Sequence, residues 1–275
     1  MPADLPSLSG GRRINGGSAE STPGYPLVTV ITAVFNGEPH IAECIESVLL
    51  QDYPNIEHLV LDGKSTDGTV GVLRGYENSI ELWQSEPDSG VYDAWNKGLN
   101  LARGEWIAFL GADDTYLPGA IAAYMRLAKE TPDADYLSSQ IQWLHPSGHA
   151  RTIGKPWQWP LFSRYNCCAH AGSMHRRRLF DQYGRFDASY LISGDYEFLL
   201  RARTALHAAF MPRLTVRMKA GGVSDSRAAF HEAGRAKIET GGLPWRIAFL
   251  DLRLGILKYD IWTSLQFLRR RFKSI

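Results

Sequence analysis

Cysteine is scarce in this chain, and its arrangement does not suggest a metal centre or a disulfide framework. The three cysteines, Cys44, Cys167 and Cys168, form no CxxC pattern and no Cys/His zinc pattern. An odd number that includes two direct neighbours is not typical of a disulfide-stabilised fold. We therefore expect a protein of the reducing cytoplasm.

The chain also lacks a surplus of either charge and a long apolar run. Its 275 residues include 30 basic and 29 acidic side chains, for a net charge of +1. This balance disfavours nucleic acid as a partner, because such proteins carry a broad positive surface. No stretch reaches the roughly 18 uncharged apolar residues of a membrane span, and residues 1–26 lack an apolar signal region. We expect neither secretion nor a membrane-spanning helix.

Strands and helices alternate in the part of the sequence after residue 26. The run LVTVITAVF, residues 27–35, is continuously apolar or β-branched, as in a strand buried on both faces. An amphipathic helical pattern follows in residues 40–51, and a second strand pattern occupies residues 56–62. These β-α units predict parallel strands with right-handed crossovers. Their turns contain neither GxGxxG nor GK[ST], which disfavours dehydrogenases and P-loop enzymes.

Polar residues end these first strands. Asn36 follows the first strand, and Asp62 ends the second, shortly before Ser65 and Asp67. A carboxylate such as Asp62 can accept hydrogen bonds from a nucleobase or a ribose, because it is an acceptor only. The alternative for Asp62 and Asp67 is turn and cap chemistry. The residues alone leave both interpretations open.

Residues 85–114 contain a loop, a helix and a strand that ends in two carboxylates. We expect a helix over Val91 to Arg103 and a buried strand over Trp106 to Leu110, followed by Asp113 and Asp114. The carboxyl ends of strands in an open α/β sheet line the ligand crevice. Paired carboxylates there are suited to Mg²⁺ or Mn²⁺ together with substrate phosphates. The alternative is that Asp114 caps a helix beginning near Thr115.

The second half of the chain predicts an antiparallel excursion and two further groups of functional candidates. Residues 134–153 read as a hairpin, which makes the sheet mixed. The aromatic and basic segment 155–184 includes His170 and Arg178, which could bind an acceptor or a phosphate, or belong to a packed loop and a solvated helix face. Asp195 begins a helix, where a carboxylate is either a simple cap or a stabilised general base.

Four motifs in order resemble the family-2 glycosyltransferases, especially bacterial members that build surface polysaccharides. The motifs are VTVITAVFN, LDGKSTDGT, DSGVYDAWNKGLNLARGEWIAFLGADD and GDYEFLLR, within residues 27–225. The resemblance implies a GT-A-like α/β fold, with a mixed, mostly parallel sheet flanked by helices. It also implies a nucleotide-sugar donor, with a UDP-sugar favoured, and Mg²⁺ or Mn²⁺ as cofactor.

The resemblance assigns roles to individual residues. Val34, Asn36 and Asp62 would hold the nucleobase and ribose, while Asp88, Tyr92 and Asp93 would line the donor site. Asp113 and Asp114 would bind the metal, and Asp195 would be the catalytic base. The aromatic and basic character of segment 155–184, and not the resemblance, assigns His170 and Arg178 to the acceptor or the diphosphate. Gly111 stands where many relatives carry the first acid of a DxD motif, and Gly194 stands where relatives carry an acid before the base.

The expected reaction is transfer of one sugar to a hydroxyl acceptor with inversion. No QxxRW motif of the processive synthases follows Asp195. The resemblance favours a lipid-linked saccharide as acceptor and a role in polysaccharide biosynthesis. One alternative is a sugar nucleotidyltransferase, although VFNGEPH, residues 34–40, lacks the Lys or Arg of its phosphate loop. The other is a non-catalytic subunit that only binds a sugar nucleotide.

We divide the chain into a flexible leader (1–26), a catalytic domain (27–225) and an amphipathic helical extension (226–275). From Leu243 the extension combines dense apolar residues with seven Lys or Arg against two Asp, a local net charge of +5. Such a pattern is typical of a helix in a membrane interface, here the inner face of the cell membrane. The alternative is a helix docked on the catalytic domain or in a homodimer interface.

Overall fold

The computed structural model describes residues 8–17, 22–222, 224 and 226–272. Within these residues the strands form a single mixed sheet, as the sequence predicts. The strands are β1 (Leu8–Gly10), β2 (Val28–Val34), β3 (Ile56–Asp62), β4 (Leu82–Ser85), β5 (Trp106–Gly111), β6 (Thr115–Tyr116), β7 (Tyr136–Leu144), β8 (Ala150–Ile153), β9 (Ser173–Arg176) and β10 (Ala208–Lys219). Their spatial order is β1-β4-β3-β2-β5-β9-β7-β10-β6, with β8 paired to β7.

Parallel and antiparallel pairs divide this sheet into two parts. Strands β4, β3, β2 and β5 are parallel to one another, as are β7 and β10. Strand β9 lies antiparallel between β5 and β7 and joins the two parallel groups. The antiparallel pairing of β7 with β8 confirms the hairpin predicted for residues 134–153.

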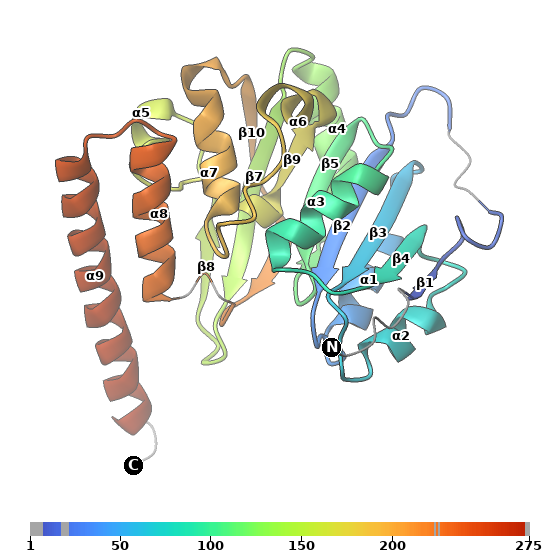
Figure 1. Ribbon diagram of the computed structural model, residues 1–275, viewed down its shortest axis with the longest axis horizontal. Coiled ribbons are helices and arrows are strands. Elements are labelled where there is room, and N and C mark those ends of the chain that lie inside the picture. The colour runs from blue at the N-terminus through green and yellow to red at the C-terminus, as the bar shows by residue number, and fades with distance from the viewer. Residues whose placement is uncertain (1–7, 18–21, 223, 225, 273–275) are drawn as a thin grey trace, which may run out of the picture.

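Helices cover both faces of the sheet, and Figure 1 shows α3 and α7 crossing in front of the strands. The helices are α1 (Ile41–Leu49), α2 (Thr69–Gly75), α3 (Val91–Leu101), α4 (Ala120–Glu130), α5 (Trp159–Phe162), α6 (Arg177–Tyr183), α7 (Gly194–Ala202), α8 (Arg227–Glu239) and α9 (Trp245–Phe272). Single 3-10 turns occur at His170–Gly172 and Arg203–Ala205.

Alternating side chains of the central strands pack into two apolar layers, one on each face of the sheet. In β2, Val28 and Val30 pack with α1, α2 and α4, while Ile31 packs with α3, α6 and α7. All three side chains are fully buried. This explains why the run from residue 27 to 35 is apolar throughout, because a central parallel strand is covered on both sides.

The beginning of the chain differs from the expected free leader. Residues Leu8–Gly10 pair antiparallel with β4. Arg13 then donates to the Leu101 carbonyl and forms an ion pair with the buried carboxylate of Glu57. The leader expectation is therefore wrong for this part, because the edge of β4 and buried acids provide partners that composition cannot reveal. Residues 1–7 and 18–21 lie outside the described residues, and the domain boundary stays a prediction.

The segment after β5 also differs from expectation. Instead of a helix near Thr115, residues Thr115–Tyr116 form β6, which pairs antiparallel with β10. Helix α4 begins only at Ala120, and its N-cap residue is Gly119. Asp114 is thus not a helix cap, so its carboxylate is available to bind a ligand.

Helix α9 runs beside α8 at one end of the molecule, well away from β1 (Figure 1). Its Asp251 is buried, and Arg164 binds this carboxylate through Nε (3.2 Å) and an Nη nitrogen (2.6 Å). The hydroxyl of Tyr165 donates to the same carboxylate at 3.1 Å. One face of α9 is therefore docked on the rest of the protein. Among the described residues no helix has the length and apolar character needed to cross a membrane.

Candidate active site

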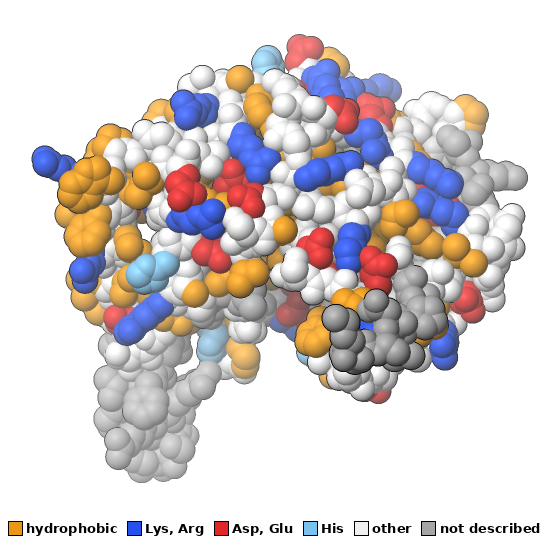
Figure 2. All heavy atoms as spheres, in the orientation of Figure 1, with side chains coloured by type: hydrophobic (Ala, Val, Ile, Leu, Met, Phe, Trp, Pro, Cys, Tyr) orange, Lys and Arg blue, Asp and Glu red, His pale blue; other side chains and the backbone are white. Residues whose placement is uncertain are grey.

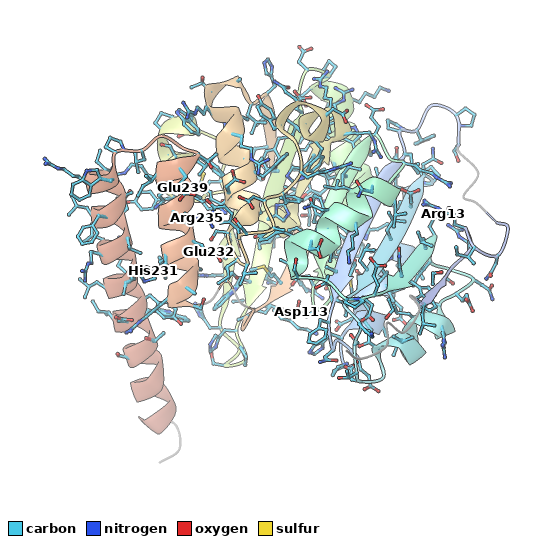
Figure 3. The ribbon with its side chains drawn as sticks, in the orientation of Figure 1. Arg13, Asp113, His231, Glu232, Arg235 and Glu239 are labelled. Carbon is cyan, nitrogen blue, oxygen red and sulfur yellow. The ribbon has the colours of Figure 1, made fainter. Side chains whose placement is uncertain are left out.

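A cavity of about 490 Å³ opens where β2, β5 and β10 end. The sheet brings its walls together from distant parts of the sequence, because the carboxyl ends of the parallel strands β2 and β5 meet at one edge. Seven of the residues singled out from the sequence line it: Val34, Asn36, Tyr92, Asp113, Asp114, His170 and Asp195. Figure 3 labels Asp113 on this side of the sheet.

Asp113 and Asp114 converge above Gly111. A Cβ atom at residue 111 would lie 2.8 Å from Oδ2 of Asp114 and 3.2 Å from Oδ1 of Asp113. Asp114 is 6% exposed, and its Oδ1 is buried without a hydrogen-bond partner among the described residues. Burial, and then the charge of Asp113, raises the pKa of Asp114 to about 7. Both carboxylates therefore offer oxygen atoms to one small volume that a side chain at 111 would fill.

This arrangement fits a divalent cation that is shared with a substrate. Among the described residues no group of three or more His, Cys, Asp or Glu could hold a metal ion. Two carboxylates with an unused buried oxygen match Mg²⁺ or Mn²⁺, whose remaining ligands are substrate phosphates and water. A cation at this position would also relieve the repulsion between the two acids.

Asp195 lies at the start of α7, at another wall of the cavity. Its Oδ1 is 3.0 Å from the hydroxyl of Tyr92, which is also 2.6 Å from the Ile192 carbonyl, so the single Tyr92 proton is shared between them. Burial, with the nearby Asp195 charge, raises the pKa of Tyr92 and keeps this proton in place. The side chain of Asp195 stays 17% exposed, so it is fixed in orientation and still accessible.

His170 lies between Asp195 and the aromatic floor of the cavity. Its Nδ1 is 3.9 Å from Oδ2 of Asp195, and its ring stacks on Phe109 with centroids 5.3 Å apart. Burial lowers the pKa of His170 in spite of the Asp195 charge, so the ring is neutral. Neither ring nitrogen has a hydrogen-bond partner among the described residues. A neutral His170 leaves the Asp195 charge uncancelled and has two nitrogen atoms for a ligand.

Asn36 and Asp62 are held by the turn after β3. The Asn36 side-chain oxygen accepts from the Thr66 backbone N–H at 2.9 Å. Asp62 is buried, and its carboxylate accepts from Ser65 and from the Ser85 hydroxyl. The hydrogen bonds of Asp62 within the described residues are thus those expected if its role is to stabilise the turn. Asp62 does not line the cavity.

Asp88 and Asp93 flank the cavity without lining it. Asp88 faces Gly63, where a Cβ atom would lie 2.7 Å from its Oδ2, and burial raises the pKa of Asp88. Asp93 accepts from the backbone N–H of Ser89 at 2.9 Å. Both carboxylates therefore shape the loop that leads into α3.

Arg178 is the predicted residue that the structure separates from the others. It forms an ion pair with Asp135 and lies in α6, next to Arg177, which binds the Gly104 carbonyl at the amino end of β5. The cavity lies at the opposite end of that strand. Arg178 therefore does not reach the candidates that line the cavity, and its position does not support the expected role at the acceptor or the diphosphate.

Several residues of the site were not identified from the sequence. Lys219, at the end of β10, lines the cavity, and its charge and backbone N–H lower the pKa of Asp114 against the effect of burial. Trp95 and Trp143 provide apolar walls. Lys219 could not be found by motif, because only the pairing of β10 with β6 brings it beside residues 113 and 114.

Comparison with known proteins gives this geometry a context. A family model described as "Glycosyl transferase family 2" matches residues 29–182. An uncharacterised glycosyltransferase of Mycobacterium tuberculosis is 35% identical over 182 residues, which are 64% of this chain and 69% of that protein. The putative teichuronic acid biosynthesis glycosyltransferase TuaG of Bacillus subtilis is 40% identical over 94 residues, 33% of this chain and 37% of TuaG.

Two solved structures share the fold at low sequence identity. Residues 1–349 of S. aureus TarS in complex with UDP-GlcNAc superpose with a TM-score of 0.63 and 17% identity, covering 82% of this chain and 70% of that TarS fragment. A mannosyltransferase of Pyrobaculum calidifontis in complex with GDP-Man and Mn²⁺ gives a TM-score of 0.61 and 19% identity, covering 89% and 85%. The GT-A-like arrangement expected from the sequence is thus confirmed at the level of the fold.

Proposed function

Because the chain belongs to glycosyltransferase family 2 and is a nucleotide-sugar glycosyltransferase, we propose that it transfers one sugar per encounter, with inversion, to a hydroxyl acceptor. The observation that carries this proposal is that one cavity joins Asp113 and Asp114 to Asp195. The first two are suited to a metal-bound diphosphate, and the third to a general base. Family membership disfavours the alternative of a nucleotidyltransferase.

The donor occupies the part of the cavity near β2 and β5. Val34 and Asn36 line the region for the nucleoside, beside the turn that Asp62 stabilises. Asp113 and Asp114 would hold Mg²⁺ or Mn²⁺ together with the diphosphate. When bound, such an ion neutralises the charge that develops on the leaving diphosphate. A UDP-sugar remains our favoured donor, although the structural neighbours bind UDP-GlcNAc in one case and GDP-Man in the other.

Asp195 takes the proton from the acceptor hydroxyl as its oxygen attacks the anomeric carbon. Tyr92 orients the carboxylate through Oδ1, which leaves Oδ2 directed towards His170 and the cavity. Neutral His170 does not cancel the charge of the base, and its ring nitrogens can bind the acceptor or the diphosphate. Attack opposite to the leaving group inverts the anomeric configuration, and no protein nucleophile is required.

The acceptor is proposed to be a lipid-linked saccharide of polysaccharide biosynthesis, used at the inner face of the cell membrane. The name of TuaG supports the polysaccharide part of this proposal, because that relative is described as acting in teichuronic acid biosynthesis. The apolar and basic composition of residues 243–275 supports the lipid part.

Release of nucleoside diphosphate from UDP-sugars and GDP-sugars, measured with Mn²⁺ and with EDTA, tests the proposed function. We expect turnover only with metal. Asp195→Asn should keep the affinity for UDP but lower turnover roughly 100-fold or more, the range of general base catalysis. Replacing both Asp113 and Asp114 with Ala should weaken UDP binding to the level found with EDTA.

Asp181→Asn, which removes an exposed carboxylate of α6, serves as the matched control. It should leave turnover and UDP affinity unchanged. Near-normal turnover of Asp195→Asn would contradict the assignment of Asp195 as the base. Equal UDP binding with and without metal would remove the metal from the mechanism. No release from any sugar nucleotide would favour the non-catalytic alternative.

A further inference from the structure

Asp195 lies on the boundary between two cavities. A second cavity, of about 410 Å³, shares Ile192 and Asp195 with the first. A third, of about 560 Å³, shares Tyr165 and Phe230 with the second and reaches α9. A base must face the hydroxyl that it deprotonates. Because the first cavity is assigned to the donor, the second is the route by which an acceptor can approach Asp195.

Lys237 of α8 lines this second cavity. The residue is 7% exposed, and no hydrogen bond or ion pair joins its ammonium group to any described residue; Nζ is not among the fully buried atoms, so it keeps contact with the cavity. Its nearest recorded partner is the ring of Tyr165, whose centroid lies 5.4 Å from Nζ. Burial is the main cause that lowers the pKa of Lys237. A lysine in this position is unusual, because buried cations are normally paired.

The charges around Lys237 do not provide its missing partner. Asp251 is the nearby acid, but Arg164 binds both of its oxygen atoms and Tyr165 donates to one of them. Asp251 still attracts Lys237, but Arg164, Asp251 and Lys237 together keep one net positive charge. A cation that is largely withdrawn from solvent and makes no hydrogen bond to the protein is unfavourable, which is expected of a residue kept for a ligand.

We propose that Lys237 is the anion-binding residue of the acceptor site, and that the acceptor is a phosphate ester whose hydroxyl reaches Asp195 while its phosphate pairs with Lys237. This inference rests on the proposed transferase function and adds the chemical class of the acceptor. An ammonium group and a phosphate form a charge-assisted hydrogen bond, which is strong in a partly desolvated cavity.

The third cavity accommodates the remainder of the acceptor. It combines two more cations, Arg151 and Lys258, with the rings of Phe230, Tyr259 and Trp262. Aromatic rings can stack on sugars or cover an alkyl chain. The phosphate could therefore belong to a sugar phosphate or to an amphiphilic lipid phosphate, and both present the same group to Lys237.

Binding of two phosphate esters to the full chain tests the proposal. Glucose 1-phosphate and octyl phosphate are titrated calorimetrically in the presence of UDP and Mn²⁺, which occupy the first cavity, with octyl glucoside as a neutral comparison. Lys237→Met should weaken binding of at least one phosphate ester by about tenfold or more. Lys237→Arg retains the charge and should retain most of the affinity. The matched control is Arg235→Gln, on the same helix but paired with Glu239 and outside these cavities.

The two probes separate the two sources of phosphate. Tighter Lys237-dependent binding of octyl phosphate indicates a lipid phosphate, and the reverse order indicates a sugar phosphate. The proposal is overturned if Lys237→Met binds both esters within about twofold of the unchanged protein. UDP affinity and a cooperative thermal transition show that the variant is folded. UDP binding that still depends on Asp113 and Asp114 would then preserve the transferase function even if the acceptor proposal fails.

Discussion

His58 is a buried neutral side chain in β3 that links stability to pH. It is 3% exposed, and its Nε2 lies 3.0 Å from the Thr32 hydroxyl. Burial lowers the pKa of His58 from 6.5 to about 3. In the unfolded chain the same ring takes a proton near pH 6.5. The unfolded state therefore binds more protons between these values, so stability falls as the pH falls from 6.5 towards 3.

The predicted size of this effect is about 1.4 kcal/mol between about pH 7.5 and about pH 5.5, since one pKa unit corresponds to roughly 1.4 kcal/mol. Urea unfolding at both pH values measures it. His58→Gln should reduce the loss of stability on acidification by that amount. His231→Gln changes an exposed histidine of α8 (Figure 3) and should leave the pH dependence as it is. Identical pH dependence for all three proteins would contradict the assignment.

At the same scale, motif reasoning located the residues that meet at the ends of strands. Asp113, Asp114 and Asp195 all line one cavity, because their position after a strand or at a helix start is encoded locally. The reason for a glycine at residue 194 became clear only from the structure, because a Cβ atom there would lie 2.9 Å from the Tyr92 ring. The absence of an acid before Asp195 thus reflects a close tertiary contact, which no local pattern contains.

Helix α8 positions the loop that precedes Asp195, the proposed catalytic base. Glu232 accepts hydrogen bonds from the backbone N–H groups of Leu191, Ile192 and Ser193, at 2.8 to 2.9 Å. These groups lie just before α7, where the helix dipole also favours a negative charge. Figure 3 shows Glu232 on α8, on the side facing the centre of the molecule. Glu232 is therefore a positioning residue that acts through Asp195.

Glu232→Gln should lower turnover about tenfold while leaving the KM for the donor unchanged. The amide keeps one acceptor oxygen but places an N–H group against a backbone donor, so the loop shifts and the base is misplaced. Steady-state donor kinetics measure both parameters. Glu239→Gln is the matched control, because Glu239 lies on the same helix and pairs with Arg235 at its surface. If turnover fell equally in Glu232→Gln and Glu239→Gln, the cause would be a general effect on α8 instead.

At the scale of elements, periodicity predicted several of the longer helices and strands that have a buried face. Helices α1, α3 and α7 lie where the pattern indicated, within a few residues. The four-residue strand β9 was not predicted within the aromatic and basic segment 155–184. Strands β1 and β6 were also missed, because three and two residues are too short to show a period. Their existence depends on partners that are distant in the sequence, β4 and β10.

The whole molecule presents an apolar stripe along α9. Leu250, Leu254, Leu257 and Ile261 are 50 to 59% exposed, on a helix whose Asp251 is docked. Hydrophobic side chains gather along the visible part of α9 in Figure 2. One side of α9 therefore docks on the rest of the protein, and a different side of the same helix is available for contact with a membrane. The membrane contact of residues 243–275 stays a prediction, as does the alternative of a homodimer.

Flotation with anionic liposomes tests this stripe. The full chain should float, because apolar burial combines with attraction of Lys and Arg to anionic lipid. A triple variant with Gln at Leu250, Leu257 and Ile261 should lose most of its bound fraction. The control places Gln at Leu49 and Leu50, two exposed leucines at the end of α1. Equal flotation of the two variants would contradict the membrane role, and a concentration-dependent mass of the unchanged chain that is lost in the triple variant would favour the dimer.

The two outermost strands of the sheet have a consequence for the behaviour of the protein at high concentration. A long, flat border would expose a row of unpaired N–H and C=O groups that could recruit another chain and begin aggregation. Here the sheet finishes in β1, three residues long, on one side and in β6, two residues long, on the other. Among the described residues neither β1 nor β6 offers enough consecutive backbone for a stable intermolecular ladder, and the uncovered part of β10 beside β6 is irregular between Phe210 and Val216. Segments that look like incidental additions to the fold are therefore expected to limit edge-to-edge pairing between copies of this transferase.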